Sequence, residues 1–160
     1  MRITTKLDFK PLKKAARIHG TVDGKRMFRQ LGVAYRSFLQ RRFARYSRGS
    51  GNWPKLQPAT EERKGSTTIL RHTDVMFQAL RPSNPGAGGV EIVRGSIITL
   101  GFGGSEAHPE AEGLTIARLA EIHNFGEGNM PERKIVVPPD GPALANLKDI
   151  VQKTLNKRFR

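Results

Sequence analysis

The sequence of 160 residues has no cysteine, few aromatic residues (7%) and no apolar run long enough to cross a membrane. Without cysteine, disulfides and thiolate metal sites are excluded. The histidines are scattered, without the spacing of metal ligands: His19, His72, His108 and His123. The first residues alternate in polarity instead of forming the apolar segment of a signal peptide. We therefore expect a protein made in the cytoplasm, with no cofactor and no membrane partner.

Acidic residues are scarce in the first third of the chain. The whole sequence carries 28 Lys and Arg against 14 Asp and Glu. Residues 1–50 hold 14 basic and 2 acidic side chains, a net charge of +12, whereas residues 51–160 have a net charge of +2. A basic segment of this kind favours a polyanionic partner such as DNA, bound non-specifically. Solvated helix faces would produce the same composition.

The order of apolar patterns predicts a single α+β domain over residues 1–160, with residues 1–22 as a candidate N-terminal arm. It indicates a long basic N-terminal helix, a small mostly antiparallel sheet and a C-terminal helix. The expected helices span residues 24–46, 69–80 and 143–156, and the expected strands span residues 2–9, 90–94, 96–103 and 134–137. Residues 53–65 are expected to form an ordered loop, and periodicity leaves residues 114–125 undecided between helix and strand.

The search for catalytic motifs finds no phosphate-binding loop, nucleophile elbow or H-E-x-x-H zinc motif. Two pairs of residues two positions apart, Glu121 with His123 and His72 with Asp74, could touch on a strand. Such pairs are far more often hydrogen-bonding residues of turns and edges than acid–base dyads. We therefore expect no enzymatic activity.

Three segments carry a more specific signal when they are taken in order. The first is Trp53-Pro54-x-Leu56, followed by Thr60 and Lys64. The second is Ile69-Leu70-x-x-Thr73. The third is Ala120-x-Ile122-His123-Asn124-Phe125-Gly126, which leads into Met130-Pro131-x-Arg133. Together they resemble the Mu-type phage virion-morphogenesis family of tail-completion or head–tail joining proteins. The resemblance spans residues 28–155, about four fifths of the chain.

Two positions depart from the pattern of that family. The glycine expected after Thr73 is Asp74, and Ile135 stands in the stretch where an aromatic residue is expected after Arg133. Asp74 can still make a turn, and Ile135 can still fill a core position.

The resemblance implies a structural protein of the tailed-phage particle, located at the neck or the top of the tail. Proteins of this kind assemble as rings, and tail symmetry implies a hexamer. The implied partners are further copies of the chain, the head connector and neck proteins, and tail tube or tail terminator proteins. The ring would surround the channel that the packaged DNA crosses. The alternative from a different class is a free basic nucleic-acid-binding module, for which no recognition motif is present.

The residues of these segments also carry physical expectations of their own. Trp53 is expected to pin an irregular loop to the helical layer, and Phe125 to enter the core. Gly126 is expected at a positive φ angle, with His123 and Asn124 bonding the turn backbone. Pro131 is expected to set the entry into the last strand. Arg133 is suited to a carboxylate of the same or the next subunit. The arginines expected to face DNA or a neighbouring ring are Arg36, Arg41, Arg42 and Arg45.

Overall fold

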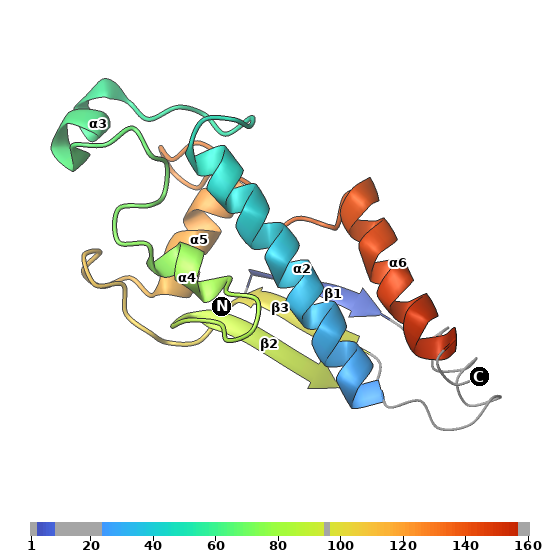
Figure 1. Ribbon diagram of the computed structural model, residues 1–160. Coiled ribbons are helices and arrows are strands. Elements are labelled where there is room, and N and C mark those ends of the chain that lie inside the picture. The colour runs from blue at the N-terminus through green and yellow to red at the C-terminus, as the bar shows by residue number, and fades with distance from the viewer. Residues whose placement is uncertain (1–2, 9–23, 95–96, 157–160) are drawn as a thin grey trace.

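The computed structural model describes residues 3–8, 24–94 and 97–156 and confirms the α+β fold (Figure 1). The elements follow the chain in a fixed order. They are β1 (Ile3–Asp8), α2 (Gly24–Ser47), α3 (Pro58–Lys64), α4 (Val75–Ala79), β2 (Gly89–Arg94), β3 (Ile97–Phe102), α5 (Ile116–Phe125) and α6 (Gly141–Asn156). Among the described residues, none of the helices combines the length and apolar character needed to cross a bilayer.

Helix α2 is the spine of the fold, as the three- and four-residue spacing of its apolar side chains predicts. Leu31, Tyr35, Leu39 and Phe43 lie on one face and are buried. The 24 residues of α2 give a length of roughly 36 Å. The helix is followed by a turn in which Gly49, at φ 82°, donates its N–H to the carbonyl of Tyr46. A left-handed glycine of this kind ends a helix without steric cost.

The sheet is antiparallel, with strand order β1-β3-β2. The central strand β3 contributes Ile98, Leu100 and Phe102, which alternate along the strand and are fully buried. At Gly101 a Cβ atom would lie 2.0 Å from the carbonyl oxygen of Ile3, so only glycine allows β1 to approach here. Strand β1 also shows that residues 3–8 of the expected arm belong to the sheet. The other residues of that arm, 1–2 and 9–22, lie outside the described residues.

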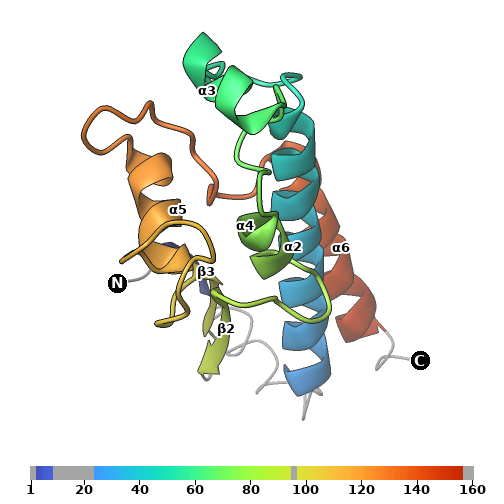
Figure 2. The same ribbon diagram turned by 90° about the vertical axis from the view of Figure 1, so that its left-hand side faces the viewer.

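The helices lie on both sides of the sheet. Helices α2 and α6 pack against each other on one side, and α5 lies on the other side, in contact with β1 and β3 (Figure 2). Thr115 caps the N-terminus of α5, because its hydroxyl accepts the N–H of Arg118. Residues 114–125, for which the sequence left helix and strand open, therefore form a helix from Ile116 onwards. Helix α6 buries Leu147 and Val151, whereas Leu144 remains 42% exposed.

Three expected elements were wrong. The loop over residues 53–65 contains helix α3, which starts with a proline in its first turn and buries no side chain. The helix expected over residues 69–80 is reduced to α4, because Leu70 and Asp74 both adopt left-handed backbone angles. The strand expected over residues 134–137 does not form, because two of its N–H groups bond to a side chain instead of to a neighbouring strand.

Candidate functional site

Trp53 joins the irregular segment after α2 to the helix itself. Its side chain is 5% exposed and meets the rings of Phe43 and Tyr46 edge to face, at centroid distances of 5.1 and 5.7 Å. Its Nε1–H also donates to the carbonyl of Lys134, 3.3 Å away. The expected pinning of this loop to the helical layer is confirmed. The indole also bonds a second segment some eighty residues further along the chain.

Arg133 bonds to backbone carbonyls and not to a carboxylate. The side chain is 3% exposed, and its Nε and Nη2 donate to the carbonyl of Pro54 at 3.2 and 3.0 Å. Nη2 also donates to the carbonyl of Lys55 at 3.4 Å. The expected carboxylate partner within the same chain is therefore wrong for the described residues. The planar guanidinium instead holds the Trp53 segment from the opposite side, and burial lowers its pKa.

The last turn of α5 also bonds to the segment around Arg133, next to the contacts of Trp53 and Arg133 described above. Asn124 accepts the N–H groups of both Ile135 and Val136 on its Oδ1, at 2.9 and 3.0 Å. The carbonyl of His123 accepts the N–H of Arg133 at 2.7 Å. These bonds replace the missing strand, so the segment after Pro131 is fixed by side chains of α5. We call Trp53, His123, Asn124 and Arg133 the Arg133 cluster.

Gly126 ends α5 at φ 68° and donates its N–H to the carbonyl of Ile122, as expected. A Cβ atom at this position would lie 2.8 Å from the backbone nitrogen of Glu132, so both the angle and the space require glycine. Phe125, by contrast, is 60% exposed. The prediction that Phe125 enters the core was wrong, because the last turn of α5 directs this position to solvent.

His123 has no hydrogen-bond partner for its buried Nδ1 atom among the described residues. Burial, with the nearby Arg133 guanidinium as a second cause, lowers the pKa of His123 to about 4. The ring is therefore neutral at physiological pH. The expected bond of the His123 side chain to the turn is not observed, although its carbonyl makes such a bond.

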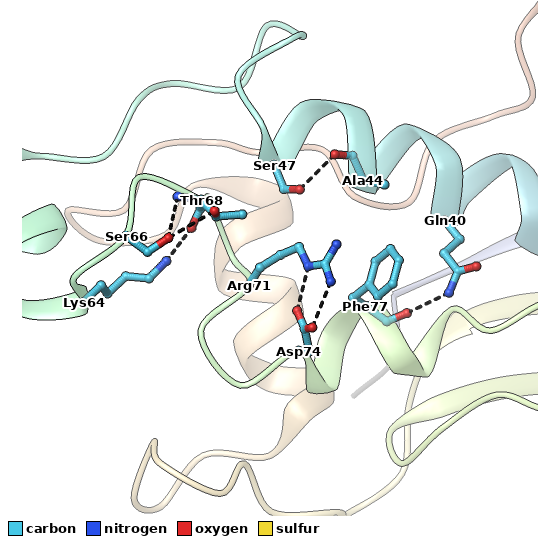
Figure 3. Close-up of polar contacts among 9 residues, drawn as sticks. All are labelled: Gln40, Ala44, Ser47, Lys64, Ser66, Thr68, Arg71, Asp74 and Phe77. Atoms are coloured by element: carbon cyan, nitrogen blue, oxygen red, sulfur yellow. Dashed lines mark hydrogen bonds and ion pairs between the residues drawn. The ribbon is translucent and has the colours of Figure 1, made fainter.

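The segment between Lys64 and Phe77 forms a turn held by its own polar groups (Figure 3). Lys64 donates from Nζ to the carbonyl of Thr68, and the N–H of Thr68 donates to Ser66 Oγ at 3.1 Å. Arg71 makes two bonds to Asp74, at 2.6 and 2.8 Å, and its guanidinium lies 4.0 Å from the centre of the Phe77 ring. These bonds lower the pKa of Asp74 and raise that of Arg71.

The other residues of the resemblance lie around these two regions. Leu56 and Leu70 are half-buried and pack against the core. Thr60 lies in α3 and is half-buried. Thr73 Oγ1 lies 3.2 Å from His108 Nε2 and joins the turn to the loop before α5. Pro131 is exposed in the segment that leads to Arg133.

The four arginines expected at a DNA or ring contact have different surroundings. Arg36 is 3% exposed, forms an ion pair with Glu91 and donates to the carbonyl of Pro82. Arg36 is therefore part of the interior, and the expectation of a surface contact was wrong for it. Arg42 is half-buried, stacks over Tyr46 and donates to the carbonyl of Lys134.

Arg41 and Arg45 are exposed, as is Arg48 one turn further along. Arg41 and Arg45, four positions apart, lie on the same face of α2, and Arg48 follows in the turn after the helix. Among the described residues, no carboxylate forms an ion pair with any of them. We call Arg41, Arg45 and Arg48 the arginine row.

In neither of the two candidate acid–base pairs do the two side chains bond to each other. Glu121 bonds to Arg118 and not to His123, because positions two apart on a helix face different directions. Asp74 bonds to Arg71, while His72 lies 3.1 Å from Glu110. Within the described part of the chain, no group of three or more metal-binding side chains is gathered. The polar groups of the Arg133 cluster mostly bond to backbone, which is an arrangement suited to holding segments together.

We found no protein-family model, characterised protein or solved structure that matches the chain.

Proposed function

We propose that the chain is a non-enzymatic structural protein of a tailed-phage particle, of the virion-morphogenesis type. In this role it is one subunit of a ring, a hexamer by the symmetry of such tails, at the neck or the top of the tail. Its partners are further copies of itself, the head connector or neck proteins, and tail tube or tail terminator proteins. Assembly takes place in the host cytoplasm, and no cofactor takes part.

The observation that carries the proposal is the backbone angle at Asp74. The pattern of the family has glycine at this position, and Asp74 lies at φ 58°, in the left-handed region that glycine adopts without cost. Asp74 therefore differs from the family pattern in residue type, but it has the left-handed backbone conformation that a glycine would favour at this position. Gly126, which matches the pattern, likewise lies at φ 68°.

The segments around Trp53 and Arg133, which both match the family pattern, contact one another, and this contact gives further support. Trp53 and Arg133 are eighty positions apart, yet Arg133 bonds to the residue directly after Trp53, and Trp53 bonds to the residue directly after Arg133. Residues that match a pattern for a structural reason are expected to bond to one another or to the backbone. The Arg133 cluster follows that expectation.

The test is to locate the chain in particles of the phage or prophage that encodes it. An image reconstruction should place a ring of copies at the neck or tail top. Deleting the gene should leave DNA-filled heads and separate tails that do not join. A particle that contains one copy, or none at the neck and tail, would contradict the proposal.

The alternative, a free nucleic-acid-binding module, is favoured by one observation. The arginine row presents three cations with no carboxylate partner among the described residues. Cations of this kind can bind phosphates without reading sequence. The DNA affinity of the isolated chain separates the two functions, as argued in the Discussion.

A further inference from the structure

The arginine row lies at the C-terminal end of α2, and an acidic loop lies between β3 and α5. Residues 103–115, between β3 and α5, contain Glu106, Glu110 and Glu112 and no lysine or arginine. All three carboxylates are exposed. The loop runs into α5, and Figure 2 shows both of them apart from α2. The arginine row is exposed at the C-terminal end of α2 and in the turn that follows it.

The acidic loop is held in one conformation by its own hydrogen bonds. The backbone of Ala107 bridges to Thr115, and Ile116 donates its N–H to the carbonyl of Glu106 at 2.9 Å. His108 Nδ1 accepts the N–H groups of Glu110 and Ala111 at 3.2 and 3.0 Å. A loop fixed in this way loses little conformational entropy when its carboxylates bind a partner.

The far end of α5 adds two exposed apolar side chains, Phe125 (60% exposed) and Met130 (49% exposed). Their turn is also fixed, because Met130 donates its N–H to the carbonyl of Glu127, and Glu127 forms an ion pair with Arg118 at 2.5 Å. Aromatic residues and methionine are enriched at protein interfaces. Helix α5 spans roughly 15 Å, so the loop and the apolar pair fit within one interface of about 800 Å² per partner.

We propose that the arginine row of one copy binds the acidic loop of a second copy, head to tail, and that the same contact covers Phe125 and Met130. Two different complementary surfaces on one subunit make a heterologous contact, which forms a ring when the rotation between neighbouring subunits closes. The inference rests on the proposed function, because it supplies the contact between neighbouring subunits of the ring. DNA phosphates would match the arginines, but they would leave the acidic loop and the apolar pair uncovered.

The experiment uses two charge-reversed variants of the full chain. The row variant is Arg41→Glu with Arg45→Glu, and the loop variant is Glu106→Lys with Glu112→Lys. A matched control for the row variant, Lys55→Glu with Arg81→Glu, makes the same change in net charge at exposed side chains outside both surfaces. Each is studied by sedimentation velocity at about 50 mM and about 500 mM salt, which brackets the range over which surface charges are screened.

The wild type and the control should associate with increasing concentration at low salt and dissociate at high salt. Each charge-reversed variant alone should associate at least about tenfold more weakly, since several surface pairs are replaced by repulsion. Mixed together, the two variants should associate again, because the intact row of one variant meets the intact loop of the other and the two reversed surfaces also carry opposite charges. Phe125→Ser should weaken association at the low salt concentration, because it removes an apolar contact without changing the charge.

Other outcomes overturn the inference. They are a mixture that stays monomeric, a control that loses association as the variants do, and a wild type that is monomeric at about 1 mM and low salt. Tight binding of the wild-type row to duplex DNA in place of self-association would assign the row to DNA instead. A ring seen in particles without this contact contradicts only the inference, whereas absence of the chain from particles contradicts the proposed function.

Discussion

Leu70 and Asp74 adopt left-handed backbone angles, at φ 56° and 58°, which cost most side chains about 1–2 kcal/mol. Aspartate tolerates this region better than alanine does, and glycine better than either. We therefore expect Asp74→Ala to be less stable than Asp74→Gly by about 1 kcal/mol, the reverse of the usual order. Both variants lose the bonds to Arg71, so the difference isolates the backbone. Urea denaturation of the two variants measures it.

The same comparison bears on the resemblance from which the proposed function starts. If Asp74→Ala equals or exceeds Asp74→Gly in stability, the position does not require a glycine-like conformation. The argument from Asp74 to the family pattern would then fail. Gln78→Ala with Gln78→Gly, inside α4, provides the control, because alanine should be the more stable residue at a right-handed helical position.

His123 should make the stability of the fold fall in mildly acidic solution. Its pKa is about 4 in the folded chain, below the 6.5 of the free side chain, so the unfolded state binds the proton more readily. The stabilisation is complete above pH 6.5 and is lost as the pH falls from 6.5 towards 4. Wild type should therefore lose about 3 kcal/mol more than His123→Gln between pH 7 and pH 4. Denaturant titrations of both proteins across this range measure the difference.

The comparison with His123→Gln removes the contribution of the carboxylates, which titrate in both proteins. Equal pH dependence of the two proteins would show that His123 is hydrated or partnered in solution. A chemical shift titration of the His123 ring supplies a direct reading, because its midpoint should lie near pH 4, well below the 6.5 of the free side chain.

At the scale of elements, the sequence was sufficient where apolar spacing alone decides the structure. Helix α2 and the β2–β3 hairpin lie within one or two residues of their expected bounds, because a buried stripe or alternation marks each of them. Helix α3 was missed because it buries no side chain, so no apolar pattern marks it. The helix expected from residue 69 was too long because the left-handed angle at Leu70 interrupts a continuous apolar pattern.

The candidate site was harder to predict, because its bonds join positions far apart in the sequence. Arg36 is one of several similar arginines on α2, and only its ion pair with Glu91, 55 positions away, removes it from the surface. The segment around Ile135 has the composition of a strand, yet its N–H groups bond to Asn124. Phe125 is as apolar as any core residue, and its exposure follows from its place in the last turn of α5.

The conformation of the segment after Arg133 should depend on the Asn124 side chain, which accepts backbone N–H groups as a neighbouring strand would. Asn124→Ala leaves the N–H groups of Ile135 and Val136 without an acceptor, which should cost about 2–4 kcal/mol. Amide exchange of Ile135 and Val136 should quicken more than that of residues in the sheet. The control is Asn156→Ala, which removes only an exposed bond from Gln152 and should change stability by less than about 0.5 kcal/mol. Unchanged exchange at Ile135 would contradict the role of Asn124.

At the scale of the whole molecule, the net charge of +14 combines basic side chains in the interior with basic side chains on the surface. Arg36 belongs to the first group, since its carboxylate and carbonyl partners lie within the fold. A test of DNA binding must therefore leave Arg36 intact. Removing it would strand Glu91 and lower stability whatever the function of the chain.

The affinity of the isolated chain for DNA distinguishes a ring subunit from a free nucleic-acid-binding module. A ring subunit should bind duplex DNA only in the non-specific range, with a dissociation constant of about 10⁻⁴–10⁻⁶ M at physiological salt. Replacing the arginine row with glutamine should then weaken binding no more than replacing Lys55, Arg81 and Lys148, which are exposed elsewhere. Fluorescence anisotropy with a labelled duplex, over a series of salt concentrations, measures both effects.

A free module would give a different pattern in the same titrations. The wild-type chain would bind in the nanomolar range, and removing three phosphate contacts would reduce the salt slope by about 3, since each contact contributes about 0.9. The control variant would keep the wild-type slope, because its charges lie outside the row. That result would contradict the ring as the primary function and would assign the outward face of α2 to nucleic acid. Weak binding that both variants reduce equally leaves the arginine row available for the acidic loop of a neighbouring copy.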